Sequence, residues 1–454
     1  MISATTLKID LGSDKEGFIV AHEVFSYRQI QSLFAVIDEH MDKAVGTPQA
    51  SHCFYLKISN HVSSAILLLY LLDRKLSFFA GTPDGAFMPE FCSHVITPVE
   101  DSYTEPGIES NIGADSDNRH MQPNLAFFRS SGTTGRPKFI CYHQDSLLQN
   151  AQGVCQRFGL SHTDRVLVPV PIHHMFGFGV GLLPALLSGA SVQLLAHTNV
   201  VKLFDQLKTF QPSFALITPS LIKMLNMLGK KNHYPSRFVS AGDTLFKEVY
   251  DAFARNYGKL YNLYGCTELG AIAISEDDPT EDIVPVTALE GVHMRVVENE
   301  KGEVLVNHPF GFEYYTDEYG RAKDNNSVGG WYRTSDMGKL VSPNALSVLG
   351  RVDSCVNRYG FLVASKEIES ELHKLLPDVE QLLVMVMDEQ GVAGNKVVAF
   401  LEAGGVVQQV KKSIKQTLPP KYQPDDCVIL DKIPTLPNGK PDKILLKKNY
   451  YSLN

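Results

Sequence analysis

Short apolar runs typical of buried strands alternate with longer helix-like segments between residues 125 and about 275. The strand-like runs include RVLVPVPI (165–172) and KLYNLYG (259–265), and the helix-like segments include VKLFDQLKTFQ (201–211) and FKEVYDAFARNYG (246–258). Such alternation builds parallel sheets in which each strand is joined to the next by a helix that covers the sheet. The sequence therefore predicts an α/β fold with layered α/β subdomains.

Segments on either side of this alternation predict further elements. Residues 60–80 favour a buried helix followed by a short strand, and the polar, acidic stretch 98–124 favours an irregular surface connection. Short strands separated by turns over residues 283–349 indicate a small β-barrel or antiparallel sheet. A compact α+β pattern follows, so we expect an amino-terminal domain over residues 1–350 and a carboxyl-terminal domain over residues 351–454.

Composition argues against several classes of partner. The 454-residue chain has a formal net charge of −8 and no block of Lys or Arg, so nucleic acid and anionic membrane surfaces are not expected partners. Its seven scattered cysteines have no C-x-x-C spacing, which fits free thiols in a reducing compartment rather than a zinc site. The sequence has no signal-peptide pattern, and no apolar stretch approaches the roughly 20 residues that a membrane span needs, so we expect a cytoplasmic protein. The sequence does not predict its oligomeric state.

A loop rich in glycine and hydroxyl residues, SSGTTGRPK (130–138), lies between two apolar runs. Its backbone amides, hydroxyls and lysine can surround a triphosphate, although a glycine-rich hairpin without a ligand is the alternative. The spacing is not that of a Walker A loop, and the second apolar run predicts a strand–loop–strand arrangement. The predicted phosphate-binding residues are Ser130, Ser131, Gly132, Thr133, Thr134, Gly135 and Lys138.

Four further motifs follow this loop in order along the chain: NLYGCTE (262–268), YRTSD (332–336), GRVDS (350–354) and LPNGK (436–440). Together the five motifs resemble the adenylate-forming superfamily of acyl- and aryl-CoA synthetases, adenylation domains and firefly luciferase. The resemblance implies a large amino-terminal domain of layered α/β subdomains with a small β-barrel. A small, mobile α+β lid domain would follow it.

The resemblance also implies a reaction. The chain would activate an apolar or aromatic carboxylic acid with ATP and Mg²⁺ as an acyl-AMP, release pyrophosphate, and transfer the acyl group to the thiol of CoA. A free-standing enzyme that loads the phosphopantetheine arm of an acyl carrier protein is the first alternative. A catalytically degenerate nucleotide-binding protein is the second, and a luciferase-like oxygenase shares the same motifs.

By the same resemblance, the adenine and the phosphates contact two central segments. Tyr264 would stack on adenine, Thr267 would touch the α-phosphate, and Glu268 would ligate Mg²⁺, which prefers carboxylate and phosphate oxygens. Gly242 and Asp243 in SAGDTL (240–245) match the segment that lines the adenine. A strand-end turn with a helix-capping threonine is the alternative interpretation of NLYGCTE.

The later motifs would supply the ribose, hinge and lid contacts. Asp336 would accept hydrogen bonds from both ribose hydroxyls, and Arg351 would donate to the same sugar; a surface ion pair is the alternative. Asp353 matches the hinge of the superfamily, and Gly360 matches the loop that lines the thiol channel. Lys440 matches the catalytic lysine that bridges the acyl carboxylate and the α-phosphate.

The segment PVPIHHMFGFGVGLL (169–183) resembles the one that carries a His or aromatic gate beside the substrate carboxylate. His174 is the matching residue and joins Lys440, Thr267 and Glu268 as a predicted catalytic residue. Relatives that activate amino acids place an Asp in this segment, whereas a charged amino group would be left unpaired here. The predicted pocket residues are His174, Phe176, Ala241 and Gly265.

Three residues depart from the superfamily pattern. Gly is usual where Ser335 stands, many relatives have Lys where Asn357 stands, and most have Arg where Leu362 stands. Because that Arg is missing, we do not predict a contact between this loop and a phosphate or CoA. These departures favour the degenerate alternative, which Glu268 and Lys440 oppose.

Overall fold

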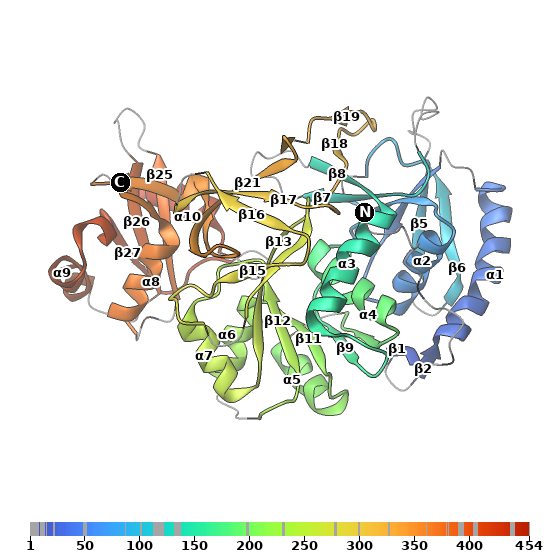
Figure 1. The fold of residues 1–454 in the computed structure, drawn as a ribbon, viewed down its shortest axis with the longest axis horizontal. Coiled ribbons are helices and arrows are strands. Elements are labelled where there is room, and N and C mark those ends of the chain that lie inside the picture. The colour runs from blue at the N-terminus through green and yellow to red at the C-terminus, as the bar shows by residue number, and fades with distance from the viewer. Residues whose placement is uncertain are drawn as a thin grey trace.

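Two large sheets with helices against them make up most of the molecule, and the carboxyl-terminal elements gather at one end (Figure 1). Among the helices described, none is long and apolar enough to cross a membrane. The computed structural model describes residues 9, 14, 16–20, 23–48, 52–86, 88–99, 102–111, 122–130, 138–196, 199–228, 232–276, 279–297, 300–325, 327–359, 361–377, 379, 381–388, 395–402, 407–435 and 441–453.

Within the described residues the larger sheet has 14 strands, and its centre is the parallel α/β unit that the alternating sequence pattern predicts. The parallel strands lie in the order β10-β9-β11-β12-β13, and β1 extends them in parallel with β2 antiparallel at the edge. These strands are β1 (Glu16–Val20), β2 (Glu23–Ser26), β9 (Arg165–Val168), β10 (Ser191–Leu194), β11 (Phe214–Ile217), β12 (Arg237–Ala241) and β13 (Leu260–Cys266).

The helices that join these strands begin at local capping signals. The Asn199 side chain accepts a hydrogen bond from the Lys202 amide at the start of α5, and Thr218 caps α6 in the same way. Helix α3 ends at Gly159, whose φ of 58° suits a residue without a side chain. The helices are α3 (Gln144–Phe158), α4 (Leu183–Ser188), α5 (Val200–Thr209), α6 (Pro219–Met227) and α7 (Lys247–Asn256).

The strands expected as a small barrel or sheet continue the larger sheet in antiparallel fashion. Strand β14 pairs with β13, and the order then runs through β15, β22, β21 and β17 to β16 at the edge. The strands are β14 (Gly270–Ile274), β15 (Val286–Ala288), β16 (His293–Val296), β17 (Lys301–Asn307), β20 (Ser327–Val328), β21 (Trp331–Ser342) and β22 (Ala345–Arg351).

The second sheet has eight strands in the order β19-β18-β8-β7-β4-β3-β5-β6. Helix α2 (Val62–Asp73) and strand β4 confirm the helix and strand expected over residues 60–80, and α1 (Tyr27–Val45) contacts β6. The expectation of an irregular connection over 98–124 is wrong in part, because β6 pairs with β5. The strands are β3 (Cys53–Lys57), β4 (Ser77–Gly81), β5 (His94–Val99), β6 (Ser102–Ser110), β7 (Leu125–Ser130), β8 (Lys138–His143), β18 (Tyr314–Thr316) and β19 (Ala322–Lys323).

The elements after Arg351 have their own sheets and their own apolar clusters. Ile368, Leu372, Val384 and Ile414 belong to one such cluster, which contains only residues of this part of the chain. A separate core is expected of a separate folding unit. The elements are the 3₁₀ turns η2 (Val352–Ser354) and η3 (Pro420–Tyr422), strands β23 (Cys355–Arg358), β24 (Phe361–Ala364), β25 (Gln381–Asp388), β26 (Asn395–Glu402) and β27 (Asp426–Leu430), and helices α8 (Ser365–Leu375), α9 (Val407–Thr417) and α10 (Lys443–Leu453).

Helix α8 joins this unit to the larger sheet chiefly through charged side chains. Each side of the junction supplies both lysines and carboxylates to these ion pairs. A small apolar cluster that includes Leu349 and Ala364 lies beside them. A contact of this kind is weaker than a buried apolar interface. The three ion pairs are Lys301–Glu367 (2.5 Å), Lys366–Asp243 (3.4 Å) and Lys374–Asp282 (2.5 Å).

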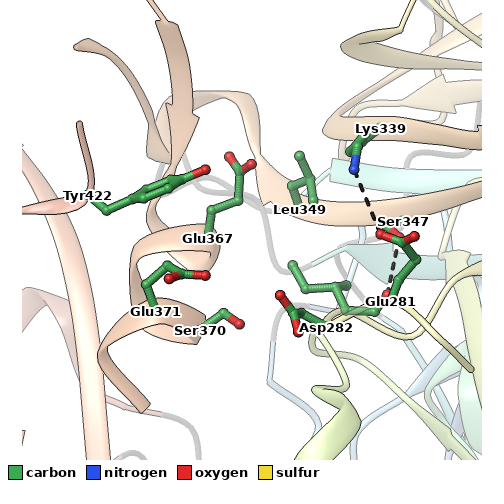
Figure 2. A pocket seen from close by; sticks show the side chains of 10 residues that line it. Glu281, Asp282, Lys339, Ser347, Leu349, Glu367, Ser370, Glu371 and Tyr422 are labelled. Carbon is green, nitrogen blue, oxygen red and sulfur yellow. Dashed lines mark hydrogen bonds and ion pairs between the residues drawn. The ribbon is translucent and has the colours of Figure 1, made fainter. Parts of the chain in front are cut away.

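A cavity of about 150 Å³ lies within the same junction. Figure 2 shows Glu367 and Glu371 of α8 on one side and Asp282 and Leu349 on the other, with open space between them. The junction is therefore polar and incompletely packed, which suits two units that change their relative position.

Candidate active site

The carboxyl ends of the parallel strands bring three predicted segments to one edge of the larger sheet. The segment with His174 follows β9, the segment with Gly242 follows β12, and β13 runs into the turn that carries Glu268. Ligands of open α/β sheets bind at this edge. The topology thus places residues from three sequence motifs around one candidate site.

Strands β7 and β8 confirm the strand–loop–strand arrangement expected around residues 130–138. They pair in antiparallel register, with Ser130 opposite Lys138, so the two ends of the loop are adjacent. Several predicted residues lie outside the described part of the chain, namely Ser131, Gly132, Thr133, Thr134, Gly135, Gly360 and Lys440.

The turn after β13 is held by contacts from β8 and from the segment that precedes β18. The Tyr142 hydroxyl of β8 donates to the carbonyl oxygen of Thr267 at 2.8 Å, and the Phe312 amide donates to the carbonyl oxygen of Glu268 at 2.9 Å. A β-carbon at Gly265 would lie 2.3 Å from the Gly270 carbonyl oxygen, so only glycine fits there. The backbone of the NLYGCTE motif is therefore tightly held, while the Thr267 and Glu268 side chains stay partly exposed.

The Asp336 carboxylate lies between two donors from different strands. The Tyr264 hydroxyl donates to Oδ2 at 2.7 Å, and the Arg351 guanidinium contacts Oδ1 at 3.1 Å and the Thr334 carbonyl oxygen at 3.0 Å. Burial raises the pKa of Asp336 above its usual range, although the Tyr264 hydrogen bond and the Arg351 charge lower it.

This pair differs from an ordinary surface ion pair. The Asp336 side chain is only 14% exposed, whereas that of Arg351 is 48% exposed. A carboxylate has about four acceptor positions, so Asp336 keeps acceptor capacity after these two contacts. The structure thus brings together Tyr264, Asp336 and Arg351 as the sequence predicts.

Ser335 has a φ of 57°, in the left-handed region that favours glycine. We expect Ser335→Gly to raise the free energy of unfolding by about 0.5–1 kcal/mol, because a side chain costs about 1–2 kcal/mol in this conformation and unfolded glycine is more flexible. Urea denaturation measures the change. Ser342→Gly, on an exposed residue at the end of β21, is the control and should be neutral or destabilising. Equal losses in both variants would contradict this explanation of Ser335.

Glu268 is in contact with the buried Tyr315, which in turn contacts the buried Tyr332; sequence reasoning missed both tyrosines. The Tyr315 hydroxyl donates to Glu268 Oε1 at 2.9 Å, and the hydroxyls of Tyr315 and Tyr332 lie 2.8 Å apart. The Lys138 ammonium lies 5.0 Å from the centroid of the Tyr315 ring. Tyr332 is the first residue of the YRTSD motif, so the sequence could have marked it as a site residue. Tyr315 lies in no predicted motif.

The donor set around Glu268 fits Mg²⁺ in a nucleotide complex. Within the described ranges, no group of three or more His, Cys, Asp or Glu side chains could hold a metal by itself. Mg²⁺ is commonly held by one or two carboxylates together with substrate phosphates and water. A single partly exposed carboxylate near Lys138 therefore fits a cation that arrives with ATP.

The segment after β12, which the sequence predicts to line the adenine, contacts the carboxyl-terminal unit. Ala241 is buried at the end of β12, and Gly242 has a φ of 94°, which suits a residue without a β-carbon. The carboxylate of Asp243 is exposed and lies 3.4 Å from the Lys366 ammonium of α8. A predicted adenine-lining segment is thus in contact with the carboxyl-terminal unit.

The predicted acid pocket begins with two stacked histidines and a π-helix. The rings of His173 and His174 lie 4.3 Å apart; His174 is exposed and His173 is partly buried. The π-helix, η1 (Phe176–Leu182), is a form often found at functional sites. Its glycines allow close packing, since a β-carbon at Gly177 would lie 2.3 Å from the Pro171 carbonyl oxygen.

Three partly buried histidines should make the folded state less stable in acid. Burial lowers the pKa of His173, His308 and His373 from 6.5 to about 4. Between these values the unfolded chain binds more protons than the folded chain, so we expect the free energy of unfolding to fall as the pH drops from about 6.5 to about 4. The loss should be on the order of 1–3 kcal/mol per histidine. Urea denaturation at several pH values measures it, and His308→Gln should reduce the slope; an unchanged slope would contradict the assignment.

The sequence of this chain matches a known family over the region that holds most of the candidate site. A model described as AMP-binding enzyme matches residues 95–315, which include the 130–138 loop and the turn with Glu268. The medium-chain fatty-acid–CoA ligase of Escherichia coli (strain K12) is 26% identical over 354 residues, which cover 73% of this chain and 62% of that protein. Over this region the chain is similar to AMP-binding enzymes, in agreement with the resemblance of its motifs to the adenylate-forming superfamily.

Two solved structures, MatB and an anthranilate CoA ligase, share the fold of this chain along almost its whole length. The ATP-bound MatB from Rhodopseudomonas palustris has a TM-score of 0.78 at 20% identity, covering 98% of this chain and 97% of that one. The anthranilate CoA ligase AuaEII, in complex with anthranoyl-AMP, has a TM-score of 0.78 at 16% identity, covering 97% and 95%. In sequence, the matched regions span 62%, 64% and 59% of the length of the first three curated relatives.

Proposed function

We propose that this chain is an AMP-forming acid–thiol ligase, which activates an apolar or aromatic carboxylic acid with ATP and transfers the acyl group to CoA. One observation carries the proposal. The Asp336 carboxylate lies between Tyr264 and Arg351, and burial together with the charge of Glu268 raises its pKa. A largely buried carboxylate with spare acceptor capacity suits the ribose of a nucleotide, whose phosphates the predicted 130–138 loop would hold.

The nucleotide would be held by groups with distinct chemistry. Asp336 would accept both ribose hydroxyls, and Arg351 would donate to the same sugar. The Tyr264 ring would face adenine, and its hydroxyl contact with Asp336 would orient that carboxylate. Ala241, Gly242 and Asp243 would line the base and the start of the acid pocket.

The triphosphate would be held by the 130–138 loop and the turn after β13. Loop amides, hydroxyls and Lys138 would donate to phosphate oxygens, and Thr267 would donate to the α-phosphate. Glu268 would hold Mg²⁺, which when bound supplies positive charge that offsets the negative charge of the phosphates. These donors lower the repulsion between the acid and ATP, both of which are anions.

Residues 351–454 would form a lid that delivers Lys440 to the α-phosphate. Thr435 and Pro441 pair in an antiparallel bridge, so the chain enters and leaves the 436–440 segment at one place. Asp353 in η2 would act as the hinge, and Gly360 would line the thiol channel in the second step. The polar junction and cavity beside α8 support a lid that moves.

An apolar or aromatic acid fits the predicted pocket best. Residues 169–183 contain no Asp or Glu, and Phe176 is partly buried beside buried Met175 and Phe178. His174 would contact the acid carboxylate at the pocket mouth. Two of the matched proteins are named for acids of this kind, a medium-chain fatty acid and anthranilate, whereas another is named for oxalate. All seven cysteines are free thiols, which supports a reducing, cytoplasmic setting.

The acceptor is tested by mass spectrometry of thioester products. The protein is incubated with ATP, Mg²⁺ and a panel of acids, together with either CoA or a phosphopantetheine-loaded carrier protein. We expect acyl-CoA with at least one apolar or aromatic acid. Acylated carrier without acyl-CoA would favour the carrier-loading alternative, and no thioester on either acceptor would contradict the ligase proposal.

A further inference from the structure

A chain of hydroxyl groups ends on the carboxylate of Glu268. Glu268 can only accept, so the Tyr315 hydroxyl donates its single proton to Oε1 at 2.9 Å. The Tyr332 hydroxyl lies 2.8 Å from that of Tyr315 and therefore donates to the Tyr315 oxygen. The order of donation runs from Tyr332 through Tyr315 to Glu268.

Both tyrosines are packed so that their hydroxyls have little freedom to move. Tyr315 is 6% exposed and Tyr332 is 7% exposed. The Phe312 ring packs edge-on against both, with ring centroids 4.8 Å and 5.5 Å away.

The same ring also contacts the base of the phosphate loop. The Lys138 ammonium lies over the Tyr315 face, 5.0 Å from its centroid, within the range of a cation–π interaction. Strand β18 makes this contact possible, because it pairs with β8 and places Tyr315 opposite Ile140, two residues from Lys138. One side chain thus contacts two predicted phosphate-site groups, one acidic and one basic.

We propose that Tyr315, supported by Tyr332, is a positioning residue for the metal–phosphate site: it holds one oxygen of Glu268 and leaves the other free for the cation. This inference rests on the proposed function, in which Glu268 holds Mg²⁺. Mg²⁺ requires near-ideal octahedral geometry, so a carboxylate held in one orientation binds it better than a rotating one. Outer groups that orient a metal ligand typically affect metal affinity 10- to 100-fold.

The test measures ATP binding by titration calorimetry over a series of free Mg²⁺ concentrations. Tyr315→Phe removes the hydroxyl but keeps the ring under Lys138. The matched control is Tyr314→Phe, because Tyr314 points to the other face of β18 and packs against the separate cluster that contains Cys141. We expect Tyr315→Phe to raise the Mg²⁺ concentration for half-maximal enhancement of ATP affinity by about 10- to 100-fold. ATP affinity without metal should not change in either variant.

A second variant keeps the test decisive if Tyr315→Phe folds poorly. Tyr332→Phe removes the donor one step further from Glu268 and should shift the Mg²⁺ dependence in the same direction by a smaller factor. The inference is overturned if the Mg²⁺ dependence of Tyr315→Phe equals that of Tyr314→Phe, or if Tyr332→Phe has the larger effect. Failure of the wild-type protein to bind ATP at any Mg²⁺ concentration would instead overturn the proposed function itself.

Discussion

Replacement of Lys440 by alanine is expected to slow acyl-adenylate formation by about 10²- to 10³-fold while the dissociation constant of ATP stays close to the wild-type value. The acid carboxylate and the α-phosphate repel each other as they approach, and a lysine placed between them is needed most in the transition state. Single-turnover formation of acyl-AMP measures the rate, and calorimetry measures ATP binding.

Lys443→Ala is the matched control for this variant. Lys443 lies three residues further along the chain, at the exposed start of α10, and carries the same charge. It should retain nearly full activity. A parallel loss of ATP affinity in Lys440→Ala, or equal loss of activity in both variants, would contradict the role given to Lys440.

Replacement of Asp336 by alanine is expected to weaken ATP binding by about 10- to 100-fold, which is the value of one or more hydrogen bonds to a charged acceptor. The substitution removes the proposed ribose acceptor and leaves the Tyr264 hydroxyl and the Arg351 guanidinium without this partner. The apparent KM for ATP should rise more than kcat falls.

Asp336→Asn keeps the shape of the side chain but not its charge, so its ATP affinity should fall between that of the wild type and that of Asp336→Ala. Asp251→Ala is the control for loss of a carboxylate, since Asp251 pairs with Lys247 within α7 and is not a predicted site residue. Unchanged ATP affinity in Asp336→Ala would remove this carboxylate from the nucleotide site.

Local sequence patterns were enough to predict the parallel centre of the larger sheet and the strands around the phosphate loop. Apolar runs of strand length between amphipathic segments carry this information within a short window. The Asp336–Arg351 pair was also predictable, because β21 and β22 are adjacent strands joined by a short turn and place the two residues opposite each other.

Contacts between distant segments were not predictable in the same way. Tyr315 reaches Glu268 and Lys138 only because β18 pairs with β8, from which it is separated by about 170 residues of chain. Pairing of this kind depends on the assembled sheet, and the sequence around Tyr315 gives no sign of it. The Lys366–Asp243 pair depends likewise on how α8 docks against the larger sheet.

Strand β6 shows a different reason for failure. It is an edge strand, and Pro106 is the one residue among its nine that is buried. Polar residues and proline are common on edge strands because they prevent further pairing. The same composition is typical of surface loops, so the sequence favoured a loop.

Adenylation of a carboxylic acid by this chain is tested most directly by exchange of labelled pyrophosphate into ATP, measured with and without each member of a panel of aliphatic and aromatic carboxylic acids. Exchange reports reversible formation of an acyl-AMP and requires neither CoA nor a carrier protein. We predict exchange that depends on the acid, with at least one apolar or aromatic acid active and with the signal lost in Lys440→Ala. ATP binding without exchange for any acid would contradict adenylation and favour a nucleotide-binding protein that has lost catalysis.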